Sequence, residues 1–163
     1  MDDFITPPAR PSYDIGISGV SLLGDTIGDN FDRTVAAGPQ REALVEVATG
    51  RRWTYRELRA EVDALALGLI DAGVLKGDRV GIWAPNVAEW TMLQYATAKI
   101  GAILVTINPA YRTHELEYVL KQAGISVLVS AREFKTSNYA AMIDLVRANC
   151  PDLRRVVLRP TRG

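Results

Sequence analysis

The sequence has few residues that could bind a metal or form a covalent cross-link. Its 163 residues include one cysteine, Cys150, and one histidine, His114. A single cysteine cannot form an internal disulfide, which fits a protein of a reducing, cytoplasmic compartment. One histidine and one cysteine cannot build a usual zinc site. No metal ligand is therefore predicted. His114, in the first turn of an expected helix, is interpreted as a solvated side chain.

An excess of charge of either sign is also absent. Lys and Arg together number 19, as do Asp and Glu, so the formal net charge is zero. This balance gives no electrostatic reason to expect a nucleic acid or an acidic membrane as a partner. The longest apolar run, residues 64–70, is far shorter than the roughly 20 residues of a membrane-spanning helix. No transmembrane segment is expected, and the first residues have neither a secretory-signal nor a transit-peptide pattern.

The motifs that usually mark a nucleotide site are missing as well. No G-x-x-x-x-G-K-S/T occurs, and no G-x-G-x-x-G follows an expected strand. The carboxylates fall on expected solvated faces and are not paired for acid–base chemistry. We therefore assign no catalytic residue and no cofactor-binding residue within this chain.

Hydropathy patterning, in contrast, is well developed. Apolar residues make up 48% and charged residues 23%, which is ordinary for a globular protein and compatible with a single domain. Residues 1–24 carry several prolines and glycines and are predicted to form an irregular lead-in. Residues 25–163 are predicted to form an α/β subdomain.

Short patterns predict the first regular elements. Residues 43–47 and 52–54 flank a turn at Thr49-Gly50, which predicts an N-terminal β-hairpin. Thr54, followed by Glu57 three residues later, predicts a capping box at the start of a helix. An earlier helix is predicted with apolar residues every four positions. Its inward stripe consists of Ile27, Phe31 and Val35.

Four later apolar segments alternate with helix-length stretches. Their centres are Val80, Leu104, Leu128 and Val157. Strands joined in this way are parallel, and continuous apolar strands usually have both faces covered. The predicted fold class is therefore α/β: an open, mostly parallel sheet with helices on both faces, plus the N-terminal β-hairpin.

The helices between these strands have recognisable starts. Asn86 is predicted to cap a helix that runs to about Ile100, and Thr113 to cap the next one. A last helix is predicted over residues 139–149. Its inward residues are expected to be Met142, Leu145 and Val146.

Loops after the strands are the expected place for a ligand, because ligands of open parallel sheets bind beyond the carboxyl ends of the strands. The most polar of these loops covers residues 108–112. Tyr111 and Arg112 could face a cleft there. In the simpler interpretation, Asn108 and Pro109 shape the turn while Tyr111 packs against a neighbour. The three tryptophans are likewise interpreted as core residues rather than as the lining of a ligand tunnel. They are Trp53, Trp83 and Trp90.

Two stretches resemble the first two core motifs of adenylate-forming enzymes. Trp53-Thr-Tyr-Arg-Glu-Leu58 is similar to the first motif, and residues 98–111 are similar to the second. The form Ile107-Asn-Pro-Ala-Tyr111 is most similar to the medium- and long-chain acyl-CoA synthetase branch. The matching residues have mainly architectural roles in that family. They are Trp53, Thr54, Tyr55, Glu57, Leu58, Gly101, Asn108, Pro109 and Tyr111.

The resemblance implies a partial N-terminal subdomain of the acyl-CoA synthetase fold and, for the parent enzyme, an ATP-dependent fatty acid–CoA ligase. In that reaction the fatty acid carboxylate attacks the α-phosphate of ATP, giving an acyl-adenylate and pyrophosphate. The CoA thiol then attacks the acyl carbonyl and AMP leaves. ATP, Mg²⁺ and CoA are implied for the parent, with Mg²⁺ offsetting phosphate charge. The family's Thr/Ser/Gly-rich phosphate loop has no match here, so the chain alone is predicted to be inactive and to bind no cofactor.

Two alternatives from other classes stay open. A partial domain should expose apolar surface, so the chain could be a non-catalytic module that self-associates or binds a partner protein. It could instead be a small-ligand binder that uses Tyr111 and Arg112.

Overall fold

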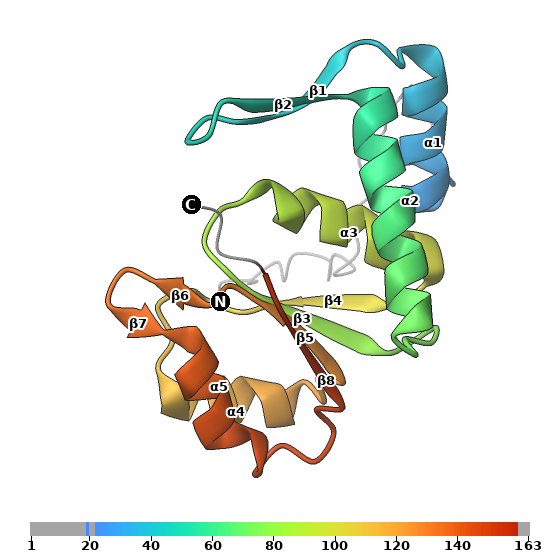
Figure 1. Cartoon of the computed structure of the whole chain (residues 1–163). Coiled ribbons are helices and arrows are strands. Elements are labelled where there is room, and N and C mark those ends of the chain that lie inside the picture. The colour runs from blue at the N-terminus through green and yellow to red at the C-terminus, as the bar shows by residue number, and fades with distance from the viewer. Residues whose placement is uncertain (1–18, 20–21, 160–163) are drawn as a thin grey trace, which may run out of the picture.

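The computed structural model describes residue 19 and residues 22–159, so most of the irregular lead-in predicted for residues 1–24 lies outside the described residues. Helices and strands then follow one another along the chain (Figure 1). In order they are α1 (Ile27–Ala37), β1 (Glu42–Glu46), β2 (Arg51–Thr54), α2 (Tyr55–Asp71), β3 (Arg79–Trp83), α3 (Ala88–Ile100), β4 (Ile103–Thr106), α4 (Thr113–Gln122), β5 (Val127–Ser130), β6 (Glu133–Phe134), β7 (Ser137–Asn138), α5 (Tyr139–Arg147) and β8 (Arg155–Leu158).

The main sheet has four parallel strands in the order β4-β3-β5-β8. Helices α1, α2 and α3 lie over one face, and α4 and α5 lie under the other (Figure 1). The step from β3 to β4 runs in one direction with its helix on the first face. The steps to β5 and to β8 run in the opposite direction with their helices on the second face. All three crossovers therefore have the same hand, and the predicted open α/β sheet is confirmed.

The expectation that both faces of every strand are covered is wrong at the two edges. Ile103 on β4 is 48% exposed and Val157 on β8 is 42% exposed, whereas Val80 and Ile82 on β3 are buried. Helices pack over the centre of the sheet and leave part of each edge strand open. Apolar composition alone does not distinguish a central strand from an edge strand.

The predicted β-hairpin and capping box are confirmed. Strands β1 and β2 pair antiparallel. The Thr54 hydroxyl accepts a hydrogen bond from the Glu57 N–H, and the Glu57 carboxylate accepts one from the Thr54 N–H. This reciprocal pair satisfies two of the free donors at the start of α2.

Two predicted helix caps are wrong. Helix α3 has Val87 as its N-cap rather than Asn86, and no local side chain caps it. Its first N–H, that of Ala88, instead donates to the Glu46 carboxylate on β1 at 2.9 Å. Thr113 is the first residue of α4 rather than its cap.

Two residues predicted to point inward are exposed. Ile27 is 57% exposed at the start of α1, and Leu145 is 72% exposed on α5. On α5, Val146 is buried as predicted, and Ile143 is buried in place of Leu145. Both errors have the same cause. A surface helix buries only one stripe of its circumference, so a small rotation of the helix about its axis changes which apolar residues are covered. The small hairpin of β6 and β7 was not predicted, because each strand is two residues long.

Helix α3 is the centre of the first helical layer. It packs against α2, α1 and β4. Near its end Lys99 reaches between two carboxylates, Asp32 of α1 and Asp63 of α2, at 2.7 Å each. The ring of Phe31 stacks on Tyr95 at 4.3 Å. One lysine therefore joins all three helices of this layer.

The tryptophans occupy the core or its margin, as expected. Trp83 is fully buried, and Trp53 and Trp90 pack against the core while partly exposed. Among residues 22–159, no helix combines the length and apolar character needed to cross a membrane.

Substitution of Glu46 should change how stability depends on pH. Hydrogen bonds from the Thr49 hydroxyl and the Ala88 N–H, together with Arg51, lower the pKa of Glu46 to about 2. A carboxyl group whose pKa is lowered by folding stabilises the fold above its unfolded pKa, and this contribution is lost as pH falls from about 4.5 toward 2. Glu46→Gln should lower the free energy of unfolding by about 1–3 kcal/mol at pH 7 and by little near pH 2.

Urea denaturation across this pH range is the measurement for Glu46→Gln. Glu42→Gln is the matched control, because Glu42 lies on the same strand and pairs with Arg52 in an exposed ion pair. This control should change stability by less than about 0.5 kcal/mol. Equal losses of stability in the two variants at pH 7 would contradict the role of Glu46 as the cap of α3.

Replacement of Lys99 should loosen the first helical layer. Burial lowers the pKa of Lys99, but hydrogen bonds to Asp32 and Asp63 outweigh it and raise the pKa overall. Lys99→Met leaves the two carboxylates facing each other, and we expect a loss of about 1–2 kcal/mol at pH 7, measured by urea denaturation. Lys121→Met, which removes an exposed pair with Glu117 on α4, should cost less than about 0.5 kcal/mol.

Candidate functional site

The chain turns to opposite faces of the sheet after β3 and after β5. From β3 it enters α3 above the sheet, and after β5 it reaches α5 below the sheet (Figure 1). Since β3 and β5 are neighbours, their carboxyl ends form a topological switch point. Ligands of open α/β sheets bind in the crevice at such a point, because the two departing loops leave a gap between them.

An apolar cavity of about 230 Å³ lies at this switch point. Its floor is formed by Ile82 of β3, Val129 of β5 and Val157 of β8, and Leu93 of α3 forms a wall. Two wider clefts, of about 500 and 580 Å³, border the β1–β2 hairpin on its α3 side and its α2 side. The sequence alone did not predict the cavity, because five separate elements contribute to its lining.

Four charged side chains form a chain of ion pairs that runs from the rim of the cavity to the hairpin. Arg159, directly after β8, lies 3.3 Å from Glu89 of α3. Glu89 lies 3.5 Å from Arg51 of β2, and Arg51 lies 2.7 Å from Glu46 of β1. With a pKa near 2, Glu46 remains ionised at neutral pH and cannot serve as a general base there. These ion pairs therefore hold the β1–β2 hairpin and the end of β8 in position, and Glu46 does not transfer a proton.

The loop after β4 is held by the buried core below it. The Trp83 indole donates to the Asn108 carbonyl at 3.0 Å, and the Tyr139 hydroxyl donates to the Pro109 carbonyl. The two rings stack at 3.7 Å. The Asn108 side chain accepts from the Ala110 N–H at 2.9 Å, which closes a local turn. The backbone of the loop is therefore fixed by residues that lie 25 to 30 positions away.

The two side chains considered as ligand contacts in this loop are engaged with the protein. Tyr111 is half-buried and packs against the core. The Arg112 guanidinium donates to the Ser137 hydroxyl at 2.9 Å, and the Arg112 N–H donates to Glu115. This arrangement agrees with the simpler interpretation of the sequence, in which the loop connects elements and Tyr111 packs against a neighbour.

The remaining motif residues lie at junctions between elements. Trp53 lies on β2, next to its last residue, and the Arg51 guanidinium lies 4.8 Å from the centre of its ring. Thr54 and Glu57 form the capping box, and Leu58 is buried on α2. Tyr55, the first residue of α2, is half-buried against the core. Gly101 ends α3 in the left-handed region, at a φ of 73°, where a side chain would be strained.

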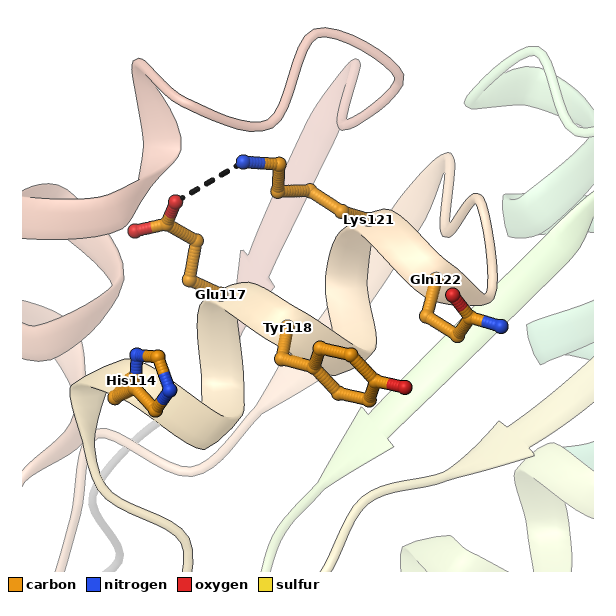
Figure 2. A pocket seen from close by; sticks show the side chains of 5 residues that line it. All are labelled: His114, Glu117, Tyr118, Lys121 and Gln122. Atoms are coloured by element: carbon orange, nitrogen blue, oxygen red, sulfur yellow. Dashed lines mark hydrogen bonds and ion pairs between the residues drawn. The ribbon is translucent and has the colours of Figure 1, made fainter.

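A shallow pocket of about 320 Å³ lies elsewhere, on α4 (Figure 2). Its lining residues all come from this one helix, and Glu117 and Lys121 form an ion pair at 3.1 Å. A hydrogen bond from Asn149 and the pair with Lys121 lower the pKa of Glu117. His114 is exposed, as predicted. These contacts are those of a solvated helix face.

Within residues 22–159, no three His, Cys, Asp or Glu side chains gather to hold a metal ion. Cys150 is buried, and burial raises the pKa of its thiol, which disfavours the nucleophilic thiolate. The residues that sequence reasoning did not bring together are Glu46, Glu89, Arg51 and Arg159. They lie on β1, on α3, on β2 and directly after β8, so no regular spacing in the sequence connects them.

Comparison with known proteins agrees with the resemblance of the motifs. A family model described as "AMP-binding enzyme" matches residues 31–160. The chain is 43% identical over 147 residues to the mitochondrial medium-chain acyl-CoA ligase ACSF2 of Macaca fascicularis, covering 90% of the chain and 23% of that protein. It is 40% identical over 133 residues to the putative acyl-CoA synthetase YngI of Bacillus subtilis, covering 82% of the chain and 24% of that protein.

The fold is also that of solved acyl-CoA synthetase structures. The N-terminal domain of FACL13 from Mycobacterium tuberculosis superposes with a TM-score of 0.75 at 29% identity, over 82% of this chain and 33% of that one. The chain thus spans about a quarter of the length of the curated relatives it matches. With a family match over most of its residues, the chain belongs to the AMP-binding enzyme family, and it resembles the N-terminal part of an acyl-CoA ligase.

Proposed function

We propose that this chain is part of an ATP-dependent ligase that joins medium- or long-chain fatty acids to CoA. The observation that carries the proposal is 43% identity to a medium-chain acyl-CoA ligase over 90% of the chain. The two motif stretches add support, since the first stands at the junction of β2 and α2 and the second at the junction of α3 and β4. Residues 25–163 would then form the α/β portion of the N-terminal subdomain.

The role of this part is to build and orient the sheet beside which the reaction takes place. The described residues offer no group of metal ligands, and the sequence contains no phosphate loop. ATP, Mg²⁺ and CoA would therefore be bound by the rest of the ligase. In the complete reaction the carboxylate displaces pyrophosphate from ATP, and the CoA thiol then displaces AMP from the acyl-adenylate.

The compartment is a separate proposal. A single, buried cysteine supports a reducing compartment such as the cytoplasm. The ACSF2 relatives are named as mitochondrial. Imaging of a fluorescent fusion of the parent protein, with a mitochondrial marker alongside, distinguishes the two.

An exchange assay tests the proposed activity. The purified 163-residue chain should show no fatty-acid-dependent exchange between ATP and radiolabelled pyrophosphate, because its sequence contains no phosphate loop to bind the triphosphate. A chimera in which this chain replaces the matching part of YngI should show exchange with fatty acids of medium or long chain. Exchange by the chain alone would refute its inactivity, and a folded but inactive chimera would count against the proposed function.

A further inference from the structure

The carboxylate of Glu89 lies between two arginines at the rim of the switch-point cavity. It comes from the first turn of α3, and its Oε1 lies 3.3 Å from Nε of Arg159 and 3.5 Å from Nη2 of Arg51. The three side chains are between 23% and 25% exposed, so water screens these charges less than it screens the exposed ion pairs of this protein. One carboxylate therefore connects α3 both to the β1–β2 hairpin and to the end of β8.

The two arginines depend on Glu89 to different degrees. Arg51 has a second carboxylate, because its Nε and Nη2 both donate to Glu46, at 3.0 and 2.7 Å. Among the described residues Arg159 has no ion-pair partner other than Glu89, and its Nε is buried. A cation that is mostly shielded from water is costly without a counter-charge. Loss of the Glu89 charge should therefore release the Arg159 side chain toward solvent and leave the hairpin in place.

Arg159 stands at the edge of the sheet where the carboxyl ends of the strands meet. It directly follows β8, and its N–H donates at 2.8 Å to the carbonyl of Ser130, the last residue of β5. The Ser130 hydroxyl donates at 3.1 Å to the carbonyl of Trp83, the last residue of β3. Three neighbouring strand ends are thus joined in a row, and ligands of open α/β sheets bind beyond such ends. Glu89 fixes the outermost member of this row.

We propose that Glu89 is a positioning residue for the ligase reaction and acts through Arg159. The proposal rests on the proposed function. By holding Arg159, Glu89 fixes the direction in which the chain leaves β8 toward the rest of the ligase. The relatives support this placement, because the family match extends to residue 160 and the matched part is about a quarter of their length. A misplacement of about 1 Å that originates far from the reacting atoms can lower a rate about 100-fold.

Amide hydrogen exchange, followed by NMR, tests the contact in the isolated chain. In Glu89→Gln, the Arg159 N–H should exchange about tenfold faster or more, because the residue is no longer held. The Gly50 N–H in the turn of the hairpin should change by less than about twofold, since Arg51 keeps its bond to Glu46. Unchanged exchange at Arg159, or an equal increase at Gly50, would overturn the proposed hold on Arg159.

The YngI chimera tests the effect on the reaction. Glu89→Gln and Arg159→Met should each lower kcat for exchange by about tenfold and leave the KM for the fatty acid within about twofold, because neither residue contacts substrate. The double variant should be no slower than either single variant, since both act through one contact. Arg159→Lys should retain about half of the activity or more, because one nitrogen makes the contact. Glu42→Gln is the matched control, since it removes an exposed ion pair with Arg52 and should leave kcat unchanged.

The outcomes separate the positioning role from the proposed function. An inactive chimera without substitutions would contradict the proposed function and, with it, the role of Glu89 in the reaction. In an active chimera, an unchanged kcat in Glu89→Gln, or additive losses in the double variant, would overturn the positioning role alone. The Tm of each variant is measured alongside, because a fall in kcat that only follows a lower Tm would overturn it as well.

Discussion

The fixed hand of the crossovers between parallel strands is the constraint on which the rest of this structure depends. Because β4 lies on one side of β3 and β5 on the other, the connecting helices must separate onto two faces. That separation creates the switch point between β3 and β5, and the apolar cavity lies there. The same rule leaves the first face of β8 without a helix from the described chain.

Long-range polar contacts then fix the elements around this sheet. The carboxylate of Glu46 reaches from the hairpin to the first N–H of α3, and Lys99 joins α1, α2 and α3 at the other end of the same helix. Helix α3 is thus held at both ends by partners from other elements. On the opposite side of the sheet, the stacked pair of Trp83 and Tyr139 holds the loop after β4 through two backbone carbonyls. These contacts set the shape of the carboxyl edge without contributing reactive groups.

Under the proposed function, this organisation is that of a framework within a larger enzyme. The motif residues stand at helix starts, helix ends and turns, where local geometry is demanding, as the capping box of Thr54 and the left-handed Gly101 illustrate. Chemistry at the switch point would be supplied by segments that this chain does not contain, in keeping with its span of about a quarter of the relatives' length.

Local sequence patterns determined the elements of this protein, and tertiary packing decided how they meet. The capping box, the β-hairpin and the apolar strands could be predicted because each depends on neighbours within a few residues. The cap of α3 by Glu46, the exposure of Leu145 and the strand order could not, because each depends on which elements come together in space. The cavity and its charged rim belong to this second class. Their residues share no spacing along the chain and become neighbours only when parallel strands bring their carboxyl ends to one edge.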